Sequence, residues 1–212
     1  MLVLIPIQIV VFSAYPPPDS VEGFFHLFQN NWLLGLISLD FLYVLNNIIL
    51  IFIYLSLFFR LYRGFPSLGV GALALGLVGI VCYFPSNPVF EMLSLSGRFA
   101  SASPDVQSRL LAAGEAVMAG YTGTAYVVYY ILNAAALILF SGIMLKSPFF
   151  SKKTGGFGMA AGLLMLVPSS FGMVGMVFSL ASLVPWVAFL IVLVKDLRSD
   201  KKGRKMNISS PQ

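Results

Sequence analysis

Three polar side chains recur on one face of an otherwise apolar stretch near the start of the chain. Asp40, Tyr43 and Asn47 stand at positions i, i+3 and i+7, and residues with this spacing share one side of an α-helix. A charged group inside a bilayer costs about 3 kcal/mol or more unless it is paired or hydrated. Asp40 is therefore predicted to face the interior of a helix bundle.

A second apolar stretch carries a matching polar row, because Tyr126, Tyr130 and Asn133 recur along it at depths comparable to the first row. The two rows predict one of two arrangements. In the first, a polar cavity open to the outside binds a small polar or cationic ligand, or passes protons by way of Asp40. In the second, the rows hydrogen-bond to each other and fix the pairing of two helices, at about 0.6 kcal/mol for each bond. The second arrangement is the simpler interpretation.

Two ionisable residues outside these rows are candidates for a gate or for acid–base chemistry. Glu115 either acts as an outer gate or general base near Tyr121, or is simply solvated. His26 either has a catalytic role or is a polar residue at the level of the lipid headgroups. As the only histidine, His26 excludes a multi-histidine metal centre and bis-histidine haem. Cys82 is the only cysteine, so no disulfide can form within the chain. No metal and no cofactor are predicted.

The composition indicates a membrane protein. Of 212 residues, 58% are hydrophobic and only 10% are charged, whereas soluble domains average about 25% charged residues. The net charge of +5 does not indicate a nucleic-acid partner, because eleven of the 13 basic residues lie in short clusters beside apolar segments.

The apolar stretches predict an all-α, polytopic membrane helix bundle of about six transmembrane helices with an external helical insert. The spans are expected at about 1–14, 33–59, 68–84, 121–145, 157–171 and 173–194. An interfacial helix is expected at 21–31 and the external helical insert at 85–120. Residues 1–195 would form one transmembrane domain, and residues 196–212 a basic cytoplasmic tail that is predicted to be disordered.

Two of these spans need a special argument. Residues 1–14 are apolar but short, and they are interpreted as a retained helix; the alternative is the apolar core of a signal peptide, which lacks here the usual basic residues at its start. Residues 157–194 would form a single helix about 57 Å long, nearly twice the thickness of a bilayer core. That run must therefore fold back, and Pro168 to Gly172 is the expected turn.

The basic residues test the number of spans. With the start of the chain inside, the eleven basic residues of the clusters fall on the cytoplasmic side of six spans, and only Arg98 and Arg109 fall outside. This asymmetry predicts that both ends of the chain are cytoplasmic. It also gives the basic tail a role as topology anchor, with contact to anionic lipid as a by-product.

Several short motifs resemble a known family. The segments LAAGEA (111–116), GTAY (123–126), MLKSPFF (144–150) and GFG (156–158) are similar to segments of the bacterial family called domain of unknown function 4386, and the order of the spans is similar as well. The resemblance covers residues 33–194. It implies a multi-pass protein of the bacterial inner membrane with no assigned activity, and hence no functional residues to transfer.

Three classes of function remain after these steps. The first is a structural or accessory membrane protein whose polar residues serve assembly, with a membrane-protein partner or a second copy of itself. The second is a small carrier, channel or sensor that uses the Asp40 face. The third is an intramembrane enzyme acting on a lipid or a quinone, with Asp40, Glu115 or His26 as acid or base. The third class requires two ionisable groups within reach of one apolar pocket.

Overall fold

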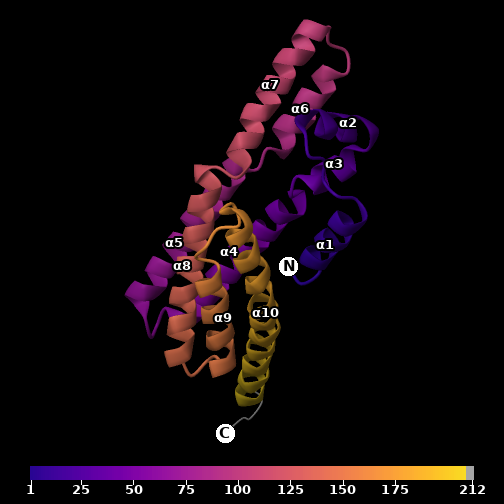
Figure 1. Ribbon diagram of the computed structural model, residues 1–212. Coiled ribbons are helices and arrows are strands. Elements are labelled where there is room, and N and C mark those ends of the chain that lie inside the picture. Colours follow the sequence, from indigo (N-terminus) through magenta and orange to yellow (C-terminus); the bar gives the residue numbers. More distant parts are fainter. Residues whose placement is uncertain (209–212) are drawn as a thin grey trace. The chain divides into compact units, whose positions relative to one another are not determined.

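The computed structural model describes residues 1–208, with side chains placed for residues 1–199, and every regular element in that range is an α-helix (Figure 1). The helices form two compact units, which are described separately. The first unit comprises Met1–Leu50 and Ile80–Tyr129, and the second comprises Ile51–Gly79 and the chain from Tyr130 onward. In chain order the helices are α1 (Leu4–Ala14), α2 (Val21–Asn30), α3 (Trp32–Ser38), α4 (Phe41–Leu61), α5 (Pro66–Ser86), α6 (Val89–Phe99), α7 (Pro104–Tyr121), α8 (Thr124–Lys146), α9 (Lys152–Leu164) and α10 (Gly172–Ile208).

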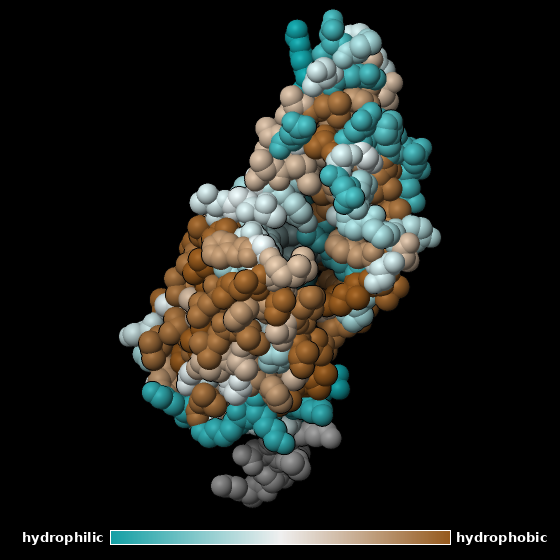
Figure 2. All heavy atoms as spheres, in the orientation of Figure 1, coloured by the Kyte–Doolittle hydropathy of each residue, from teal (hydrophilic) through white to brown (hydrophobic). Residues whose placement is uncertain are grey.

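Four helical segments are long and apolar enough to cross a membrane. They are Phe41–Leu61, Pro66–Phe99, Pro104–Lys146 and Gly172–Ser199. Their apolar side chains include many that point outward, and on α10 Met173 and Val184 are 73% and 76% exposed. Figure 2 shows apolar side chains gathered over the face that α8, α9 and α10 present, with hydrophilic ones at its lower end. Apolar surface of this extent suits contact with lipid acyl chains, so the chain has the build of an all-helical membrane protein.

A hydrophobic core joins α2, α3, α6 and α7 in the first unit. Besides apolar packing, the Ser96 hydroxyl on α6 donates a hydrogen bond to the Phe25 carbonyl on α2 at 2.8 Å, and the Gln29 amide donates to the Ser96 carbonyl at 3.2 Å. The helix expected at 21–31 and the insert expected at 85–120 therefore belong to one packed body. Its buried residues are Phe24, Phe25, Phe28, Leu36, Leu39, Val89, Met92, Phe99 and Leu110.

The single helix expected over residues 33–59 is two helices in the structure. The helix α3 ends at Ser38, α4 begins at Phe41, and Asp40 between them has a φ of 60°. This left-handed conformation interrupts a helix, and aspartate tolerates it because its short side chain can form local hydrogen bonds. Asp40 therefore stands one residue before the candidate span Phe41–Leu61, and not within it.

The second unit is organised around α8. The Tyr54 hydroxyl on α4 donates a hydrogen bond to Asn133 Oδ1 on α8 at 3.0 Å, and the Tyr54 ring stacks on Phe140 with centroids 5.5 Å apart. On α9, Gly158 leaves room for the Phe189 ring of α10. Gly158 thus serves close helix packing.

The boundaries of the last two helices differ from the expected ones. The span expected over 157–171 is the 13-residue helix α9, which ends at Leu164. The next helix starts at Gly172, whose φ of 61° favours glycine. From there α10 runs to Ile208, through most of the segment that was expected to be a disordered tail, and residues 209–212 lie outside the described part of the chain. No proline follows Pro185 in α10 to end the helix earlier.

Two glycines of α9 offer a matched test of this packing. A Cβ at position 158 would lie 2.3 Å from the Ser141 hydroxyl oxygen and 3.0 Å from a ring atom of Phe189, whereas a Cβ at position 156 would meet nothing within 4 Å. We expect Gly158→Ala to lower the free energy of unfolding by about 1–3 kcal/mol through overpacking. Gly156→Ala should raise it by about 0.5–1 kcal/mol through helix propensity. Unfolding of the purified protein in mixed detergent micelles measures both changes, and equal effects would contradict this account.

Candidate functional site

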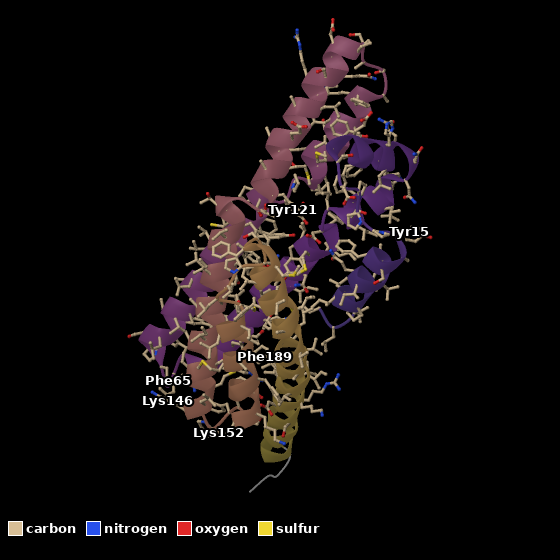
Figure 3. The ribbon with its side chains drawn as sticks, viewed as in Figure 1. Tyr15, Phe65, Tyr121, Lys146, Lys152 and Phe189 are labelled. Carbon is tan, nitrogen blue, oxygen red and sulfur yellow. The ribbon has the colours of Figure 1, made fainter. Side chains whose placement is uncertain are left out.

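Asp40 ties three other segments of the first unit together. One carboxylate oxygen, Oδ1, accepts a hydrogen bond from the side-chain amide of Gln8 on α1. The other, Oδ2, accepts one from the hydroxyl of Tyr121 at the end of α7 (Figure 3). The Asp40 carbonyl oxygen accepts a third bond from the Tyr83 hydroxyl on α5 at 3.4 Å. We call this arrangement the Asp40 junction; it consists of Asp40, Gln8, Tyr83 and Tyr121.

Asn87 connects the junction to the start of α6. Its Nδ2 donates hydrogen bonds to the Leu39 carbonyl at 2.8 Å and to the Tyr83 hydroxyl at 3.2 Å. Its Oδ1 accepts from the backbone N–H of Val89 at 3.2 Å, at the start of α6. Asn87 lies between the end of α5 and the start of α6. Its amide satisfies the Leu39 carbonyl at the end of α3 and the Val89 N–H at the start of α6, which have no partner within their own helices. The break between two helices thus positions the Tyr83 hydroxyl.

Four tyrosine rings lie beside the junction, and we call them the tyrosine cluster: Tyr43, Tyr83, Tyr126 and Tyr129. Ring centroids are 5.6 Å apart for Tyr43 and Tyr83, 4.9 Å for Tyr83 and Tyr129, and 6.1 Å for Tyr126 and Tyr129. The Tyr129 hydroxyl also hydrogen-bonds to the side chains of Tyr43 and Asn47. The cluster therefore brings tilted aromatic rings together beside the junction.

The two predicted polar rows are divided between the units. Four of their members (Asp40, Tyr43, Asn47 and Tyr126) belong to the first unit, together with the junction and the cluster. Tyr130 and Asn133 belong to the second unit and have partners there. The Tyr130 hydroxyl donates to the Ser179 hydroxyl at 3.0 Å, and Asn133 accepts from Tyr54. The partner of Asn133 is thus Tyr54, which lies seven residues after Asn47 on α4 and belongs to neither predicted row.

Sequence reasoning missed Gln8, Tyr83 and Asn87. A signal existed for Gln8, because it is the only amide side chain of the apolar segment 1–14 and needs a partner there. Tyr83 and Asn87 are four residues apart and so share one helical face. The spacing alone does not connect them to Asp40, which lies more than forty residues earlier in the chain.

The two candidate acid–base residues lie elsewhere. His26 is exposed on α2, where its Nε2 is 3.8 Å from Glu22 Oε1 and its ring meets the edge of Phe99 with centroids 6.2 Å apart. Glu115 is exposed on α7. Neither donates to or accepts from the Asp40 carboxylate. Over residues 1–199, no three His, Cys, Asp or Glu side chains gather as a metal site would require.

Two buried acceptors occupy adjacent positions on α4. The Oδ1 atoms of Asn46 and Asn47 have no hydrogen-bond partner in the described part of the chain, although the two side chains are only 4% and 0% exposed. The Nδ2 of Asn47 donates to the Tyr43 carbonyl at 3.1 Å. A buried acceptor without a partner is costly, so these oxygens are places where a hydrogen-bond donor would be stabilised.

This arrangement can hold helices together through hydrogen bonds, and it can bind a small ligand. A carboxylate that accepts from a phenol and an amide, with further phenols and amides around it, can hold helices together or hold a small donor or cation. Comparison with models of known families, with characterised proteins and with solved structures finds no match to this chain.

Proposed function

We propose that this chain is a six-span protein of the bacterial inner membrane with a structural or accessory function, in which the polar residues around Asp40 serve assembly. The observation that carries the proposal is the use of Asp40 itself. Both carboxylate oxygens and the carbonyl oxygen accept hydrogen bonds, and each bond comes from a different helix. A residue committed in this way to α1, α5 and α7 acts as a structural tie.

The six-span topology takes the four apolar segments together with α1 and α9 as shorter spans. The basic clusters support it, because they fall on one side only with both ends of the chain inside. The resemblance to the family with domain of unknown function 4386 supports the bacterial inner membrane. The core that joins α2 to α6 and α7 supports an insert outside the bilayer, since its helices carry Glu91, Arg98 and Asp105.

Cysteine labelling tests this topology. In a Cys82→Ser background, Ser101→Cys marks the exposed turn between α6 and α7, and Lys153→Cys marks the exposed start of α9. A membrane-impermeant maleimide should label position 101 in intact cells. It should label position 153 only after the membrane is permeabilised. Labelling of both positions in intact cells would refute the six-span arrangement.

A second candidate function is a small carrier, channel or sensor for a small polar or cationic ligand. Two observations favour it. No basic side chain pairs with Asp40 among the described residues, and the rings of the tyrosine cluster lie beside the junction, with the unpartnered Oδ1 of Asn47 four residues from Tyr43 on α4. Aromatic faces beside a carboxylate are a recognised setting for organic cations. The third class, an intramembrane enzyme, lacks such support, because neither His26 nor Glu115 contributes to the junction.

One experiment separates the structural proposal from the second candidate. The thermal unfolding of the purified chain is measured with and without millimolar tetramethylammonium or ethylammonium, for the natural protein and for Asp40→Asn. The structural proposal expects no shift in Tm with either cation and a normal yield of folded Asp40→Asn. The second candidate expects a rise in Tm that the substitution abolishes. Asp105→Asn, an exposed position on α7, serves as the control for a change of charge.

A further inference from the structure

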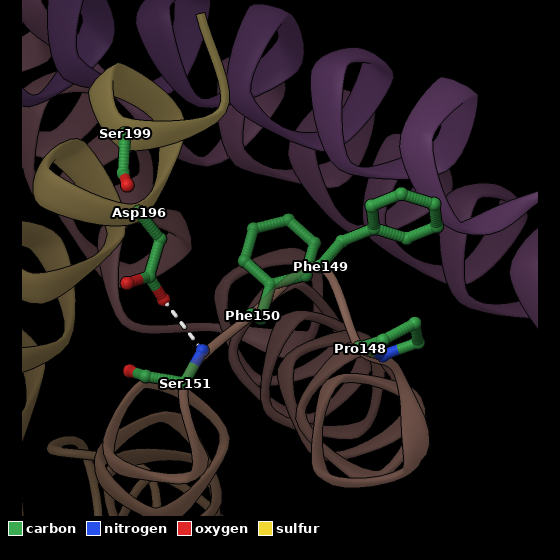
Figure 4. Close-up of a pocket in the computed structure, with 6 residues that line it drawn as sticks. All are labelled: Pro148, Phe149, Phe150, Ser151, Asp196 and Ser199. Atoms are coloured by element: carbon green, nitrogen blue, oxygen red, sulfur yellow. Dashed lines mark hydrogen bonds between the residues drawn. The ribbon is translucent and has the colours of Figure 1, made fainter. Parts of the chain in front are cut away.

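A pocket of about 350 Å³ lies in the second unit, where the loop between α8 and α9 meets the last part of α10 (Figure 4). One wall is apolar and the other polar. Its lining residues are Pro148, Phe149, Phe150, Ser151, Asp196 and Ser199. None of them belongs to the Asp40 junction or to the tyrosine cluster.

Asp196 dominates the polar wall. Its Oδ2 accepts hydrogen bonds from the Ser151 backbone N–H at 2.8 Å and from the Thr154 hydroxyl at 2.5 Å. The side chain is half-buried, and its second oxygen, Oδ1, has no partner among the described residues. The contacts of Oδ2 hold the carboxylate in place at the start of α9. The pocket therefore contains a positioned acceptor that carries negative charge.

The pocket lies where two candidate spans end. Pro104–Lys146 stops two residues before Pro148, and Gly172–Ser199 ends at a residue that lines the pocket. Lys152, Lys195 and Arg198 are exposed basic residues next to lining residues in the chain, and exposed Lys146 lies two residues before Pro148. Lys152 donates to the Leu145 carbonyl, whereas the other three form no hydrogen bond or ion pair with the described residues. This combination belongs at the level of lipid headgroups.

The combination of Asp196, the basic residues and the apolar wall restricts the chemical class of ligand that the pocket can bind. A simple anion would suit the basic residues but would be repelled by Asp196. A simple cation would pair with Asp196 but would be repelled by the neighbouring lysines and arginine. Neither would use the phenylalanines of the apolar wall, of which Phe149 is 51% exposed. A ligand that uses all three features carries an ammonium group next to a phosphate and an apolar chain.

We infer that this pocket binds the headgroup of a phospholipid with a primary ammonium group, as in phosphatidylethanolamine. The ammonium donates to Asp196 Oδ1. The phosphate pairs with the exposed basic side chains that flank the pocket, of which Lys195 and Arg198 lie on the same helix as Asp196. The beginning of the acyl chains lies against Phe149 and Phe150. Specificity for the amine comes from Asp196, because a trimethylated headgroup has no N–H to donate.

The test uses the purified full chain in detergent, titrated with phosphatidylethanolamine, its mono-, di- and trimethylated forms and phosphatidylglycerol, all with the same acyl chains. Native mass spectrometry measures the bound lipid. We expect the affinity to fall with each methyl group and to be about tenfold lower for the trimethylated lipid, the scale of one charge-assisted hydrogen bond. Equal binding along this series would overturn the inference, and the series needs no variant.

Two variants test whether Asp196 recognises the amine. The methylation preference is the ratio of the affinity for phosphatidylethanolamine to that for its trimethylated form. Asp196→Asn retains an acceptor for the Ser151 N–H and should bring this ratio close to one. Asp105→Asn makes the same change of charge at an exposed position on α7, away from the pocket, and it should leave the preference unchanged. A preference that survives in Asp196→Asn contradicts the proposal.

Two further outcomes would also contradict the proposal. The first is tightest binding of phosphatidylglycerol by every variant, because the basic residues alone would then hold an anionic headgroup. The second is displacement of the lipid by an equal concentration of water-soluble glycerophosphoethanolamine, because the apolar wall would then contribute nothing.

Discussion

Replacing Asp40 by leucine is expected to lower the free energy of unfolding by about 3–5 kcal/mol. Leucine accepts no hydrogen bond, so the Gln8 amide and the Tyr121 hydroxyl lose their partner, at about 1–3 kcal/mol for each buried donor. Leucine also adopts a φ of 60° only at a cost of about 1–2 kcal/mol. Titration of the detergent-solubilised protein with sodium dodecyl sulfate, followed by circular dichroism, measures the change.

Asparagine at the same position is the matched control. It tolerates the left-handed conformation better than other non-glycine residues, and it keeps one side-chain acceptor. We expect Asp40→Asn to change the free energy of unfolding by no more than about 1 kcal/mol. If the Asp40→Leu and Asp40→Asn variants prove equally stable, Asp40 does not hold the helices together. The structural proposal would then lose its main support.

The second large effect is expected from Phe25→Ala. Phe25 is 0% exposed in the core of α2, α3, α6 and α7, and its ring lies 5.2 Å from that of Phe99. Truncating a buried phenylalanine costs about 3–5 kcal/mol, because it removes apolar contact and leaves a cavity. We expect the backbone amides of α6 and α7 to lose protection. Hydrogen exchange read by mass spectrometry reports on these helices separately from the rest of the chain.

Phe90 on α6 provides the comparison. It is 59% exposed, and its ring meets that of Phe41 edge-on with centroids 6.0 Å apart. Phe90→Ala should therefore cost only about 1 kcal/mol, the value of such an aromatic contact. Similar loss of protection in the two variants would mean that α2, α6 and α7 do not share a cooperative core. The insert would then be a set of separate surface helices.

Much of the helical framework is a local property, and the sequence contains it. The helix expected at 21–31 corresponds to α2, because Ser20 accepts from the Gly23 N–H as a helix cap. At the start of α7 the signal is Pro104, since proline is favoured in the first turn, whereas Ser103 makes no side-chain capping hydrogen bond. Pro168 and Gly172 separate α9 from α10. These signals act within a few residues, so they can be recognised without a fold.

The polar rows were less predictable. The periodicity correctly assigns Tyr43 and Asn47 to one face of α4, but it treats Asp40 as the next residue of the same helix. The structure turns the chain at Asp40 instead, so its carboxylate is positioned by a backbone conformation and not by helical spacing. Its partners come from residues 8, 83 and 121. No local pattern connects segments so far apart in the chain.

By itself the sequence determined that this is a helical membrane protein, which stretches are apolar, and where a few of its helices begin and end. Hydropathy, capping and proline geometry are properties of short segments, and this is why they can be read in one dimension. The tertiary structure alone decided that Asp40 ties three helices and that Asp196 closes a pocket with Ser151. Each of these contacts joins residues more than thirty positions apart. Such contacts depend on how whole helices pack, and packing is a property of the assembled chain.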